Sequence, residues 1–255
     1  MAKGLRRGCL AALLLCLSTP AAWADETVSI KVGYMMLSPS GEAAAEVNGI
    51  GTRIDVENDL DLDDSEEMMA EVALSLGDFR LTAGYLPLSF QGDSILTRPV
   101  IFDGRLYPTG TPVASSVDLD ILDVGLTWYF INMDDTPSRL QLGVELAAKI
   151  TDAEASLDDR LRRRSESASA TVPIPTIGLR GRVALADFIG INGRVGYLSY
   201  SDNHFTDADI QLEVSPLPLI GAFAGYRYID VELDESDIYI DADFSGFYGG
   251  AFVRF

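Results

Sequence analysis

Apolar and polar side chains alternate in steps of two along most of this chain. In residues 28–36 every second side chain is apolar, and Ser29, Lys31 and Gly33 stand between them. Residues 139–150 repeat this arrangement. Neighbouring side chains of a β-strand point to opposite faces of a sheet. The alternation therefore predicts strands that each have one apolar face and one polar face.

Ten segments of this kind are separated by turn residues. They cover residues 27–36, 67–76, 79–90, 117–130, 139–150, 175–186, 190–200, 208–217, 219–230 and 238–255. Short connections alternate with longer ones, which cover residues 37–66, 91–116, 151–174, 201–207 and 231–237. This pattern is typical of membrane-spanning β-barrels. It predicts an all-β, up-and-down antiparallel transmembrane β-barrel of about ten strands, with eight and twelve as the alternatives, short periplasmic turns and long extracellular loops.

Aromatic residues near the strand ends favour such a barrel over a soluble β-sandwich, whose strands alternate in the same way. One set belongs to the periplasmic ends: Phe79, Trp128, Tyr129, Phe130, Phe188, Phe247, Phe252 and Phe255. A second set belongs to the opposite ends: Tyr34, Tyr85, Tyr197 and Tyr226. Transmembrane barrels carry aromatic girdles at both membrane–water interfaces. Two girdles are difficult to explain in a sandwich.

The beginning of the chain has the pattern of a secretory signal peptide. Three basic residues precede a short apolar run, and an Ala-Trp-Ala motif ends at Ala24. The apolar run is too short for a transmembrane helix, which needs about 20 residues. We expect cleavage after Ala24, which divides the chain into a signal peptide, residues 1–24, and one β-barrel domain, residues 25–255.

The chain is strongly acidic, with 39 Asp and Glu residues against 19 Lys and Arg residues. Phosphate binding needs clustered Lys and Arg, so the composition argues against a nucleic-acid partner. Both cysteines, Cys9 and Cys16, lie in the predicted signal peptide, so the barrel folds without disulfides. The sequence contains no nucleotide-binding loop, metal-ligand spacing or nucleophile elbow, and we predict no cofactor, metal or catalytic residue.

The polar faces of the predicted strands supply the charges of the barrel interior once the apolar faces are assigned to lipid. These charged residues are Arg80, Asp123, Glu145, Lys149, Arg180, Arg182, Arg194, Glu213 and Arg227. Barrels of about eight strands have interiors that side chains nearly fill, so we predict a charged network that fills the lumen. The alternative is a path for small anions along Arg180, Arg182 and Arg227, because rings of Arg favour anions in pores.

The chain ends in the sequence SGFYGGAFVRF. Steps of two back from the end give Phe255, Val253, Ala251, Gly249 and Phe247 on one face. This ending resembles the C-terminal signal that the barrel assembly machinery of outer membranes reads during insertion. The mature chain, including the stretches Ile101–Gly104 and Tyr226–Asp234, resembles the uncharacterised small outer-membrane β-barrel proteins of Gram-negative bacteria. The resemblance implies export to the cell outer membrane and contact with its lipids, including lipopolysaccharide.

Two charged clusters fall in the predicted loops. Residues 55–67 hold eight carboxylates, which we interpret as a solvated acidic loop, with a Ca²⁺ site as the alternative. Arg160, Arg162, Arg163 and Arg164 form the one basic cluster. Guanidinium groups bind phosphate and carboxylate, so this cluster is suited to contact lipopolysaccharide phosphates or the acidic loop.

The only histidine, His204, follows Asp202 by two residues in a predicted loop. This spacing resembles the Asp-x-His element of the omptin proteases, which also need a second pair of aspartates across the cleft. We identify no such pair in the sequence. A loop histidine beside aspartates is more often a polar surface residue, so catalysis by His204 is a minor hypothesis.

These observations together predict an integral outer-membrane barrel with a structural or surface-binding role. A porin-like narrow channel for small solutes or anions is the alternative, and a hydrolase at the rim that uses His204 is the minor one. The width of the lumen separates the first two, because ten strands lie between the filled eight-stranded barrels and the open sixteen-stranded porins.

Overall fold

The computed structural model describes residues 27–45, 52–102, 105–133, 139–160, 164–186, 188–201, 203–217, 219–235 and 238–255. The predicted signal peptide lies outside them. Ten strands form a barrel wall: β1 (Val28–Ala45), β3 (Ser65–Leu76), β4 (Phe79–Ile95), β7 (Pro112–Met133), β8 (Leu140–Asp159), β9 (Arg164–Ala186), β10 (Ile189–Tyr200), β11 (Asn203–Val214), β12 (Ile220–Glu235) and β13 (Ile238–Arg254). Three short strands are β2 (Ile54–Asp55), β5 (Val100–Phe102) and β6 (Arg105–Tyr107). Among the described residues, no helix is long and apolar enough to cross a membrane.

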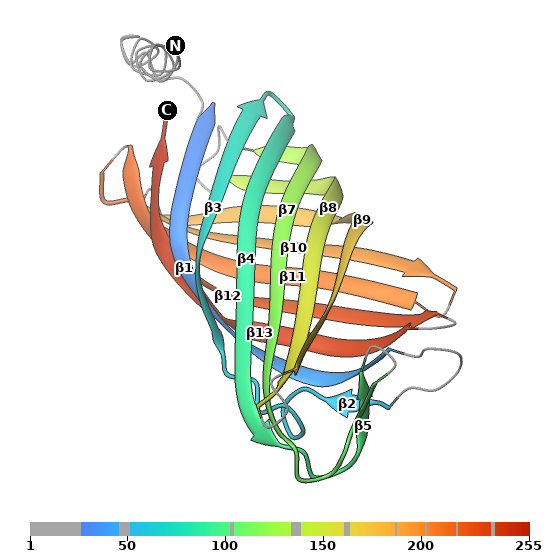
Figure 1. The fold of residues 1–255 in the computed structure, drawn as a ribbon. Coiled ribbons are helices and arrows are strands. Elements are labelled where there is room, and N and C mark those ends of the chain that lie inside the picture. Colours follow the sequence, from blue (N-terminus) through green and yellow to red (C-terminus); the bar gives the residue numbers. More distant parts are fainter. Residues whose placement is uncertain are drawn as a thin grey trace, which may run out of the picture.

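The ten wall strands form one antiparallel sheet that closes on itself (Figure 1). Each strand pairs with its neighbour in sequence order, and β13 pairs with β1 along its whole length. Closure removes the exposed edges of an open sheet. The prediction of an all-β, up-and-down barrel with ten strands is confirmed. The barrel end where β1 begins and β13 ends is called the terminal end below, and the opposite end is the loop end.

Two glycines at the β1–β13 seam make room for an aromatic ring inside the barrel. Gly33 and Gly250 are paired across the seam. A Cβ atom on either residue would lie 2.9 Å from Cζ of Phe223. This separation is shorter than van der Waals contact, so a larger residue at either position displaces the ring of Phe223.

Side-chain exposure alternates along the wall strands. Ile30 and Val32 are 40% and 45% exposed, whereas Lys31 between them is 8% exposed. Every wall strand contributes exposed apolar side chains, and together they form an outward apolar belt. A continuous apolar surface of this extent marks contact with a membrane, so the belt is the surface that faces lipid.

The aromatic residues form two girdles, with three corrections to the prediction. Residues that point outward near the terminal end are Phe79, Trp128, Phe130, Phe188 and Phe255, and those toward the other edge of the belt are Tyr34, Tyr85, Tyr197 and Tyr226. Tyr129 and Phe252 point into the barrel, because adjacent residues of a strand face opposite sides. Phe247 contacts Tyr226 with a ring-centroid distance of 5.1 Å, so it belongs to the second girdle.

Several strands continue well beyond the apolar belt. β8 and β9 pair all the way to Asp159 and Arg164, so most of the predicted loop 151–174 is a strand hairpin. The predicted loops 201–207 and 231–237 are also mostly strand. These loop predictions were wrong because outward residues outside lipid need not be apolar, so the hydropathy alternation ends while the strands continue. A strand crosses a membrane in about 9–11 residues, whereas β9 has 23.

The described parts of the connections after β1 and β4, residues 52–64, 96–102 and 105–111, form a small cap at the loop end (Figure 1). In this cap β5 and β6 form a hairpin, and β2 pairs with β1. The buried apolar residues that hold the cap against the barrel are Ile54, Leu60, Leu96, Val100, Tyr107, Val113 and Leu157. The cap therefore has an apolar core of its own.

Candidate functional site in the barrel interior

The barrel interior holds a network of charged side chains. It contains all nine residues assigned there from the sequence: Arg80, Asp123, Glu145, Lys149, Arg180, Arg182, Arg194, Glu213 and Arg227. Five more charged residues belong to it: Lys31, Glu71, Asp207, Asp209 and Arg254. Steps of two residues back from Glu213 reach Asp209 and Asp207, so the alternation contained the signal for both. Asp207 is not predicted as an interior residue, because residues 201–207 are predicted as a loop.

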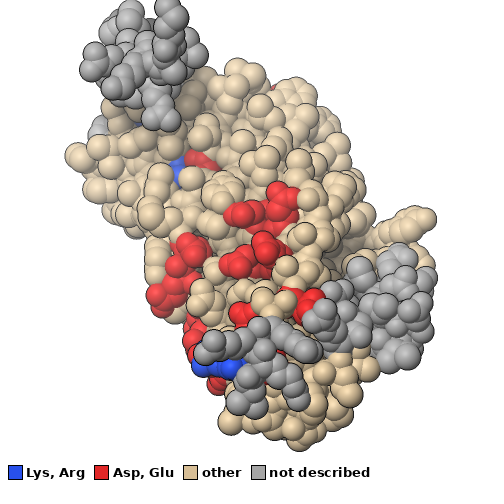
Figure 2. Space-filling model, viewed as in Figure 1, with Lys and Arg blue, Asp and Glu red and all other residues tan. Residues whose placement is uncertain are grey.

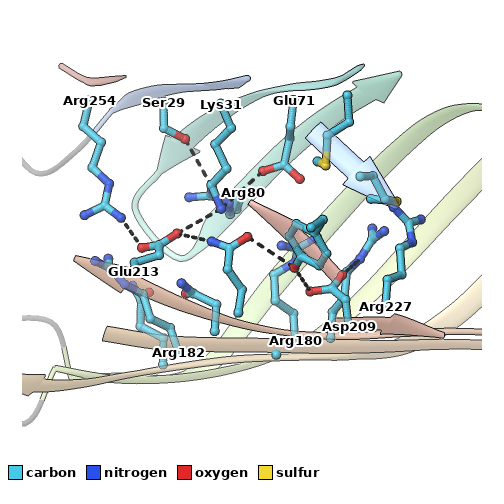
Figure 3. Close-up of a pocket in the computed structure, with 18 of the residues that line it drawn as sticks. Ser29, Lys31, Glu71, Arg80, Arg180, Arg182, Asp209, Glu213, Arg227 and Arg254 are labelled. Carbon is cyan, nitrogen blue, oxygen red and sulfur yellow. Dashed lines mark hydrogen bonds and ion pairs between the residues drawn. The ribbon is translucent and has the colours of Figure 1, made fainter. Parts of the chain in front are cut away.

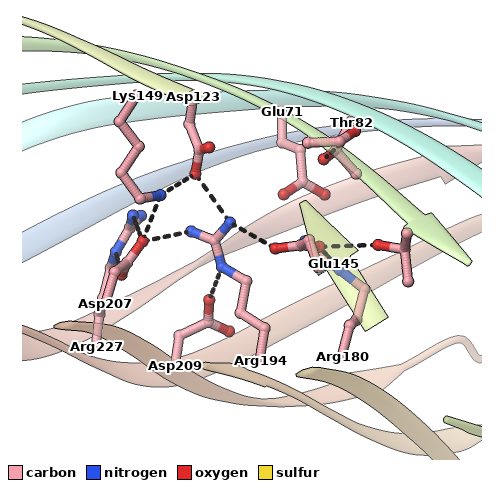
Figure 4. A network of polar contacts seen from close by, with 12 residues as sticks. Glu71, Thr82, Asp123, Glu145, Lys149, Arg180, Arg194, Asp207, Asp209 and Arg227 are labelled. Atoms are coloured by element: carbon pink, nitrogen blue, oxygen red, sulfur yellow. Dashed lines mark hydrogen bonds and ion pairs between the residues drawn. The ribbon is translucent and has the colours of Figure 1, made fainter. Parts of the chain in front are cut away.

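The centre of the network joins strands across the lumen (Figure 4). Nζ of Lys149 on β8 lies 2.6 Å from Oδ2 of both Asp123 on β7 and Asp207 on β11. Arg194 on β10 donates to Oδ2 of Asp123 at 2.9 Å and to Oδ2 of Asp207 at 3.1 Å. Its Nε donates to Asp209 at 2.6 Å. Four strands are thereby linked through the interior by charged hydrogen bonds.

Two further pairs extend this central network. The guanidinium of Arg227 donates two hydrogen bonds of 2.9 Å to the carboxylate of Asp207. On the other side, Arg180 donates to Glu145, and the hydroxyl of Thr127 donates to the same carboxylate at 2.9 Å. Most of these groups are buried. Removal of one partner from such a buried pair costs about 3–5 kcal/mol, because the other charge is left uncompensated.

A second cluster lies nearer the terminal end (Figure 3). Glu213 on β11 lies 2.9 Å from Nζ of Lys31 on β1 and accepts a hydrogen bond from Arg254 on β13. Gln211 donates to the same carboxylate at 2.7 Å. Glu71 on β3 lies 3.9 Å from Lys31. These contacts link the seam strands β1 and β13 to β11, which lies beyond β12 in the wall, and to β3, the other neighbour of β1.

A layer of buried apolar side chains lies in the interior between the central network and the loop end. Its buried residues include Leu37, Leu86, Leu88, Phe90, Ile121, Phe205 and Ile229. Phe90 stacks on Phe244 with ring centroids 5.3 Å apart. The sequence predicts a polar interior along the whole barrel, so this apolar layer is not predicted. Beyond the belt the pattern inverts. The outward residues Ser89 and Gln91 are polar, and the inward residues Leu88 and Phe90 are apolar.

The C-terminal residues of the predicted insertion signal belong to β13 and its end, at the seam with β1. Phe247 is 71% exposed and Phe255 is 48% exposed, and both point outward. Ala251 is exposed as well, whereas Gly249 and Val253 are half-buried. The role of these five residues in insertion stays a prediction.

The acidic segment 55–67 is more ordered than a solvated loop. Backbone N–H groups of Glu57 and Asn58 donate to Oδ1 of Asp55 at 3.0 and 2.8 Å. The carboxylate of Asp59 is buried and binds the guanidinium of Arg98. The solvated interpretation is therefore wrong for Asp59, because a nearby cation compensates its burial. Among the described residues, no group of three or more His, Asp or Glu side chains is placed to hold a metal ion.

The basic cluster is only partly within the described residues. Arg160 binds the carboxylate of Asp93 on β4, outside the acidic segment. Arg162, Arg163 and the side chain of Arg164 lie outside the described part of the chain. Contact of this cluster with phosphate groups stays a prediction.

His204 lies on the outward face of β11 and not in the lumen. Its Nε2 lies 2.8 Å from Oδ1 of Asp230, and its Nδ1 lies 2.8 Å from Oε2 of Glu232, both on the neighbouring β12. Burial and a hydrogen bond with Asp243 raise the pKa of Asp230. Asp202 lies outside the described residues. Both ring nitrogens thus contact carboxylates of the outer barrel wall.

The outward face directly beyond the belt carries carboxylates, here called the acidic collar. Its members are Glu66, Asp118, Asp120, Asp152, Glu154, Asp230, Glu232, Asp241 and Asp243. Part of the collar is visible on one face of the barrel in Figure 2. Tyrosines of the second girdle donate to it: Tyr34 to Glu66 at 2.8 Å, and Tyr85 to Asp120. Because charged groups avoid hydrocarbon, the collar marks one boundary of the lipid-facing surface.

No protein-family model and no curated protein matches this sequence. Several solved structures do match its fold. The outer membrane protease OmpT from Escherichia coli has a TM-score of 0.61 at 10% identity, over 93% of this chain and 99% of that chain. The transport unit of the autotransporter AIDA-I from Escherichia coli has a TM-score of 0.46 at 10% identity, over 97% and 98%. Neisserial surface protein A has a TM-score of 0.39 at 11% identity, over 89% and 97%.

Identities this low carry no information about activity or ligand. The likeness to OmpT extends over nearly the whole of both chains. It agrees with the closed ten-stranded wall, the outward apolar belt and the two aromatic girdles described above. The chain has the fold of the small outer-membrane β-barrels of Gram-negative bacteria.

Proposed function

We propose that this chain is an integral protein of the outer membrane with a closed interior and a structural or surface-binding role. The observation that supports the proposal is the packing of charged and apolar side chains inside the barrel. Ion pairs join strands across the interior, and a layer of packed apolar side chains follows toward the loop end. Hydrophobic constrictions stop ion flow because they exclude water. The packed layer therefore supports a barrel without a continuous aqueous path.

The surface for binding is the loop end of the barrel. The cap and the extended β8–β9 hairpin both lie beyond the apolar belt, and the cap has a buried apolar core. Such a core holds the exposed residues of the cap in a fixed arrangement. This favours binding, because these residues lose less conformational entropy when a partner binds. In this proposal, outer-membrane lipids including lipopolysaccharide surround the belt, and the barrel assembly machinery inserts the chain.

A narrow channel for small solutes or anions is the second candidate. A cavity toward the terminal end, where cationic side chains outnumber carboxylates, favours it. Conduction also needs a path through the apolar layer, where Phe90 and Phe244 are stacked. We therefore rank the closed barrel first.

We propose no enzymatic role. OmpT is a protease, but an identity of 10% extends only to the fold. His204 faces the outer barrel wall, and each of its ring nitrogens lies 2.8 Å from a carboxylate of β12. Hydrolysis at the loop end instead requires a base that faces the substrate cleft.

Solute flux into liposomes tests the closed barrel. Refolded protein is inserted into liposomes that enclose a chloride-sensitive dye, and insertion is verified by circular dichroism and protease protection. Wild-type protein is expected to admit chloride no faster than protein-free liposomes. The double variant Phe90→Ser, Phe244→Ser serves as a comparison, because it removes the stacked pair. Rapid chloride entry through wild-type protein contradicts the proposal and supports the channel.

A further inference from the structure

A cavity lies inside the barrel between the central network and the terminal end (Figure 3). Its volume is about 60 Å³, which corresponds to about two water molecules at about 30 Å³ each. Seven cationic side chains line it against three carboxylates. This excess is the opposite of the charge of the chain, which is −20 as a whole. The cavity therefore concentrates positive charge in a strongly acidic protein.

The positive charge is densest on the part of the cavity wall formed by β9 and β10. Arg180 is directly opposite Arg194, and Arg182 is directly opposite Asn192. Side chains at such positions have Cβ atoms about 5 Å apart, and like charges there repel each other. On β8 the residue opposite Arg182 is Gln141, which is also uncharged. The strand register thus brings three guanidinium groups and one amide together on one patch.

Two hydrogen-bond donors of this patch are buried without an acceptor. They are Nη2 of Arg180 and Nδ2 of Asn192. Arg180 binds Glu145 through Nε, which leaves Nη2 for another partner. A buried donor without a partner costs about 1–3 kcal/mol, and native proteins commonly supply one from protein, water or an ion. Both donors belong to residues that line the cavity.

The carboxylates around the cavity are mostly engaged with other groups. Glu213 binds Lys31, Gln211 and Arg254. Asp209 binds Arg194 at 2.6 Å. Glu71 lies 3.9 Å from Lys31 and has a buried oxygen without a hydrogen bond. Its negative charge would repel an anion in the cavity.

One further cation of the lining has weak neutral partners. Arg80 donates to the hydroxyls of Ser75 and Ser29 at 3.3 Å, which is long for a charged hydrogen bond. The cavity thus combines this weakly bound guanidinium with the two donors that lack an acceptor.

We propose that this cavity binds one small inorganic anion, such as chloride or phosphate, between Arg180, Arg182 and Asn192. The anion accepts hydrogen bonds from Nη2 of Arg180 and Nδ2 of Asn192. It also reduces the repulsion among the guanidinium groups of the patch. The site lies on the terminal side of the central network, so an anion reaches it without crossing the barrel. The proposal therefore goes beyond the closed barrel and does not depend on it.

Thermal unfolding of the refolded barrel in detergent micelles tests the site. Bromide or phosphate replaces gluconate at constant sodium concentration and pH. The melting temperature of the wild-type protein is expected to rise with bromide and to saturate, as for a ligand that binds the folded state. Asn192→Asp places a carboxylate where the donor was and is expected to raise the apparent Kd for bromide at least tenfold.

Asn132→Asp is the matched control, because Asn132 is exposed on β7 outside the cavity lining. It is expected to keep the wild-type response to bromide. If Asn192→Asp does not fold, Asn192→Leu removes the donor without adding a charge and is expected to weaken binding several-fold. General salt effects on stability act on all variants alike, so only a difference between variants counts as binding.

Crystals soaked in bromide locate the anion directly. An anomalous peak within hydrogen-bond distance of Arg180 and Asn192 supports the site, and a response to phosphate but not to bromide identifies an oxyanion. Equal melting-temperature shifts for wild type and a folded Asn192 variant, together with no anomalous peak, overturn the proposal. Neither result changes the liposome flux, so failure of the anion site and failure of the closed barrel are distinguishable.

Discussion

At the scale of single residues, the central network depends most on Asp207. Its carboxylate lies 2.6 Å from Lys149, 2.9 Å from Arg227 and 3.1 Å from Arg194, and the residue is 1% exposed. Three cations thus share one buried anion. A buried ion pair of this kind adds little net free energy, but loss of one partner is costly. Without Asp207, Arg227 loses the carboxylate that it binds, and Lys149 and Arg194 keep only their other partners, among them Asp123 and Asp209.

Asp207→Asn is expected to destabilise the barrel by about 3–5 kcal/mol, because three buried cations lose a common counter-charge. Asp209→Asn is the control: Asp209 is less buried and binds Arg194, which keeps other carboxylates. Its expected cost is at most about 2 kcal/mol. Urea unfolding of both variants in lipid bilayers measures the difference. Equal costs for the two substitutions contradict the importance assigned to Asp207.

Two carboxylates beyond the belt have pKa values shifted in opposite directions. Burial and a hydrogen bond with Asp243 raise the pKa of Asp230, while hydrogen bonds from Asn58 lower the pKa of Asp55. A raised pKa means that the folded state holds the proton more tightly. The stability from Asp230 is therefore present below its ordinary value of 3.8 and lost as the pH rises through the raised pKa. For Asp55 the contribution is present above 3.8 and lost as the pH falls through the lowered pKa.

The two asparagine variants consequently have opposite pH dependence. As the pH rises from about 3 to about 7, the free energy of unfolding of Asp230→Asn increases relative to wild type. That of Asp55→Asn decreases relative to wild type over the same rise in pH. Denaturant unfolding at a series of pH values measures both differences. A common sign for the two variants rules out these assignments.

At the scale of elements, the β8–β9 hairpin differs most from what its sequence indicates. The 20 residues of β8 and the 23 residues of β9 remain paired up to Asp159 and Arg164. Outward residues in this part include Asp152 and Glu154 of the acidic collar. Because these outward residues are polar, the alternation of apolar and polar side chains does not predict this part of the strands.

The extended hairpin is expected to protect its backbone amides from hydrogen exchange. Paired amides within residues 152–158 and 165–173 should exchange at least a hundredfold more slowly than an unstructured chain, because each exchange needs the ladder to open. Deuterium exchange with mass spectrometry measures this in detergent or lipid. Exchange at the rate of a free loop contradicts the paired hairpin.

The sequence predicts the strands where lipid imposes a pattern and fails where it does not. Ten strands and the inward position of residues such as Asp123 and Arg194 follow from the two-residue period in the belt. Beyond the belt the outward face need not be apolar, so the strand ends are missed, and Asp207 is missed because residues 201–207 are predicted as a loop. Which cation binds which carboxylate depends on the register across the lumen, and a sequence pattern does not contain it.

At the scale of the whole molecule, the interior has two layers with different chemistry. The charged layer lies in the terminal half, behind the apolar belt, and the apolar layer lies nearer the loop end, where the outer wall is polar. The wall is therefore apolar outside and polar inside at the belt, and polar outside and apolar inside nearer the loop end. This inversion lets the closed barrel have an apolar core outside the membrane, as soluble proteins do.

Single-channel conductance in a planar lipid bilayer is the most direct measurement of whether the interior is closed. Folded, inserted wild-type protein is expected to give no discrete current steps at either polarity, while Phe90→Ser, Phe244→Ser opens the apolar layer and gives steps or raised leak. Discrete anion-selective steps from the wild-type protein would show that the lumen conducts, and the closed barrel proposed here would be wrong.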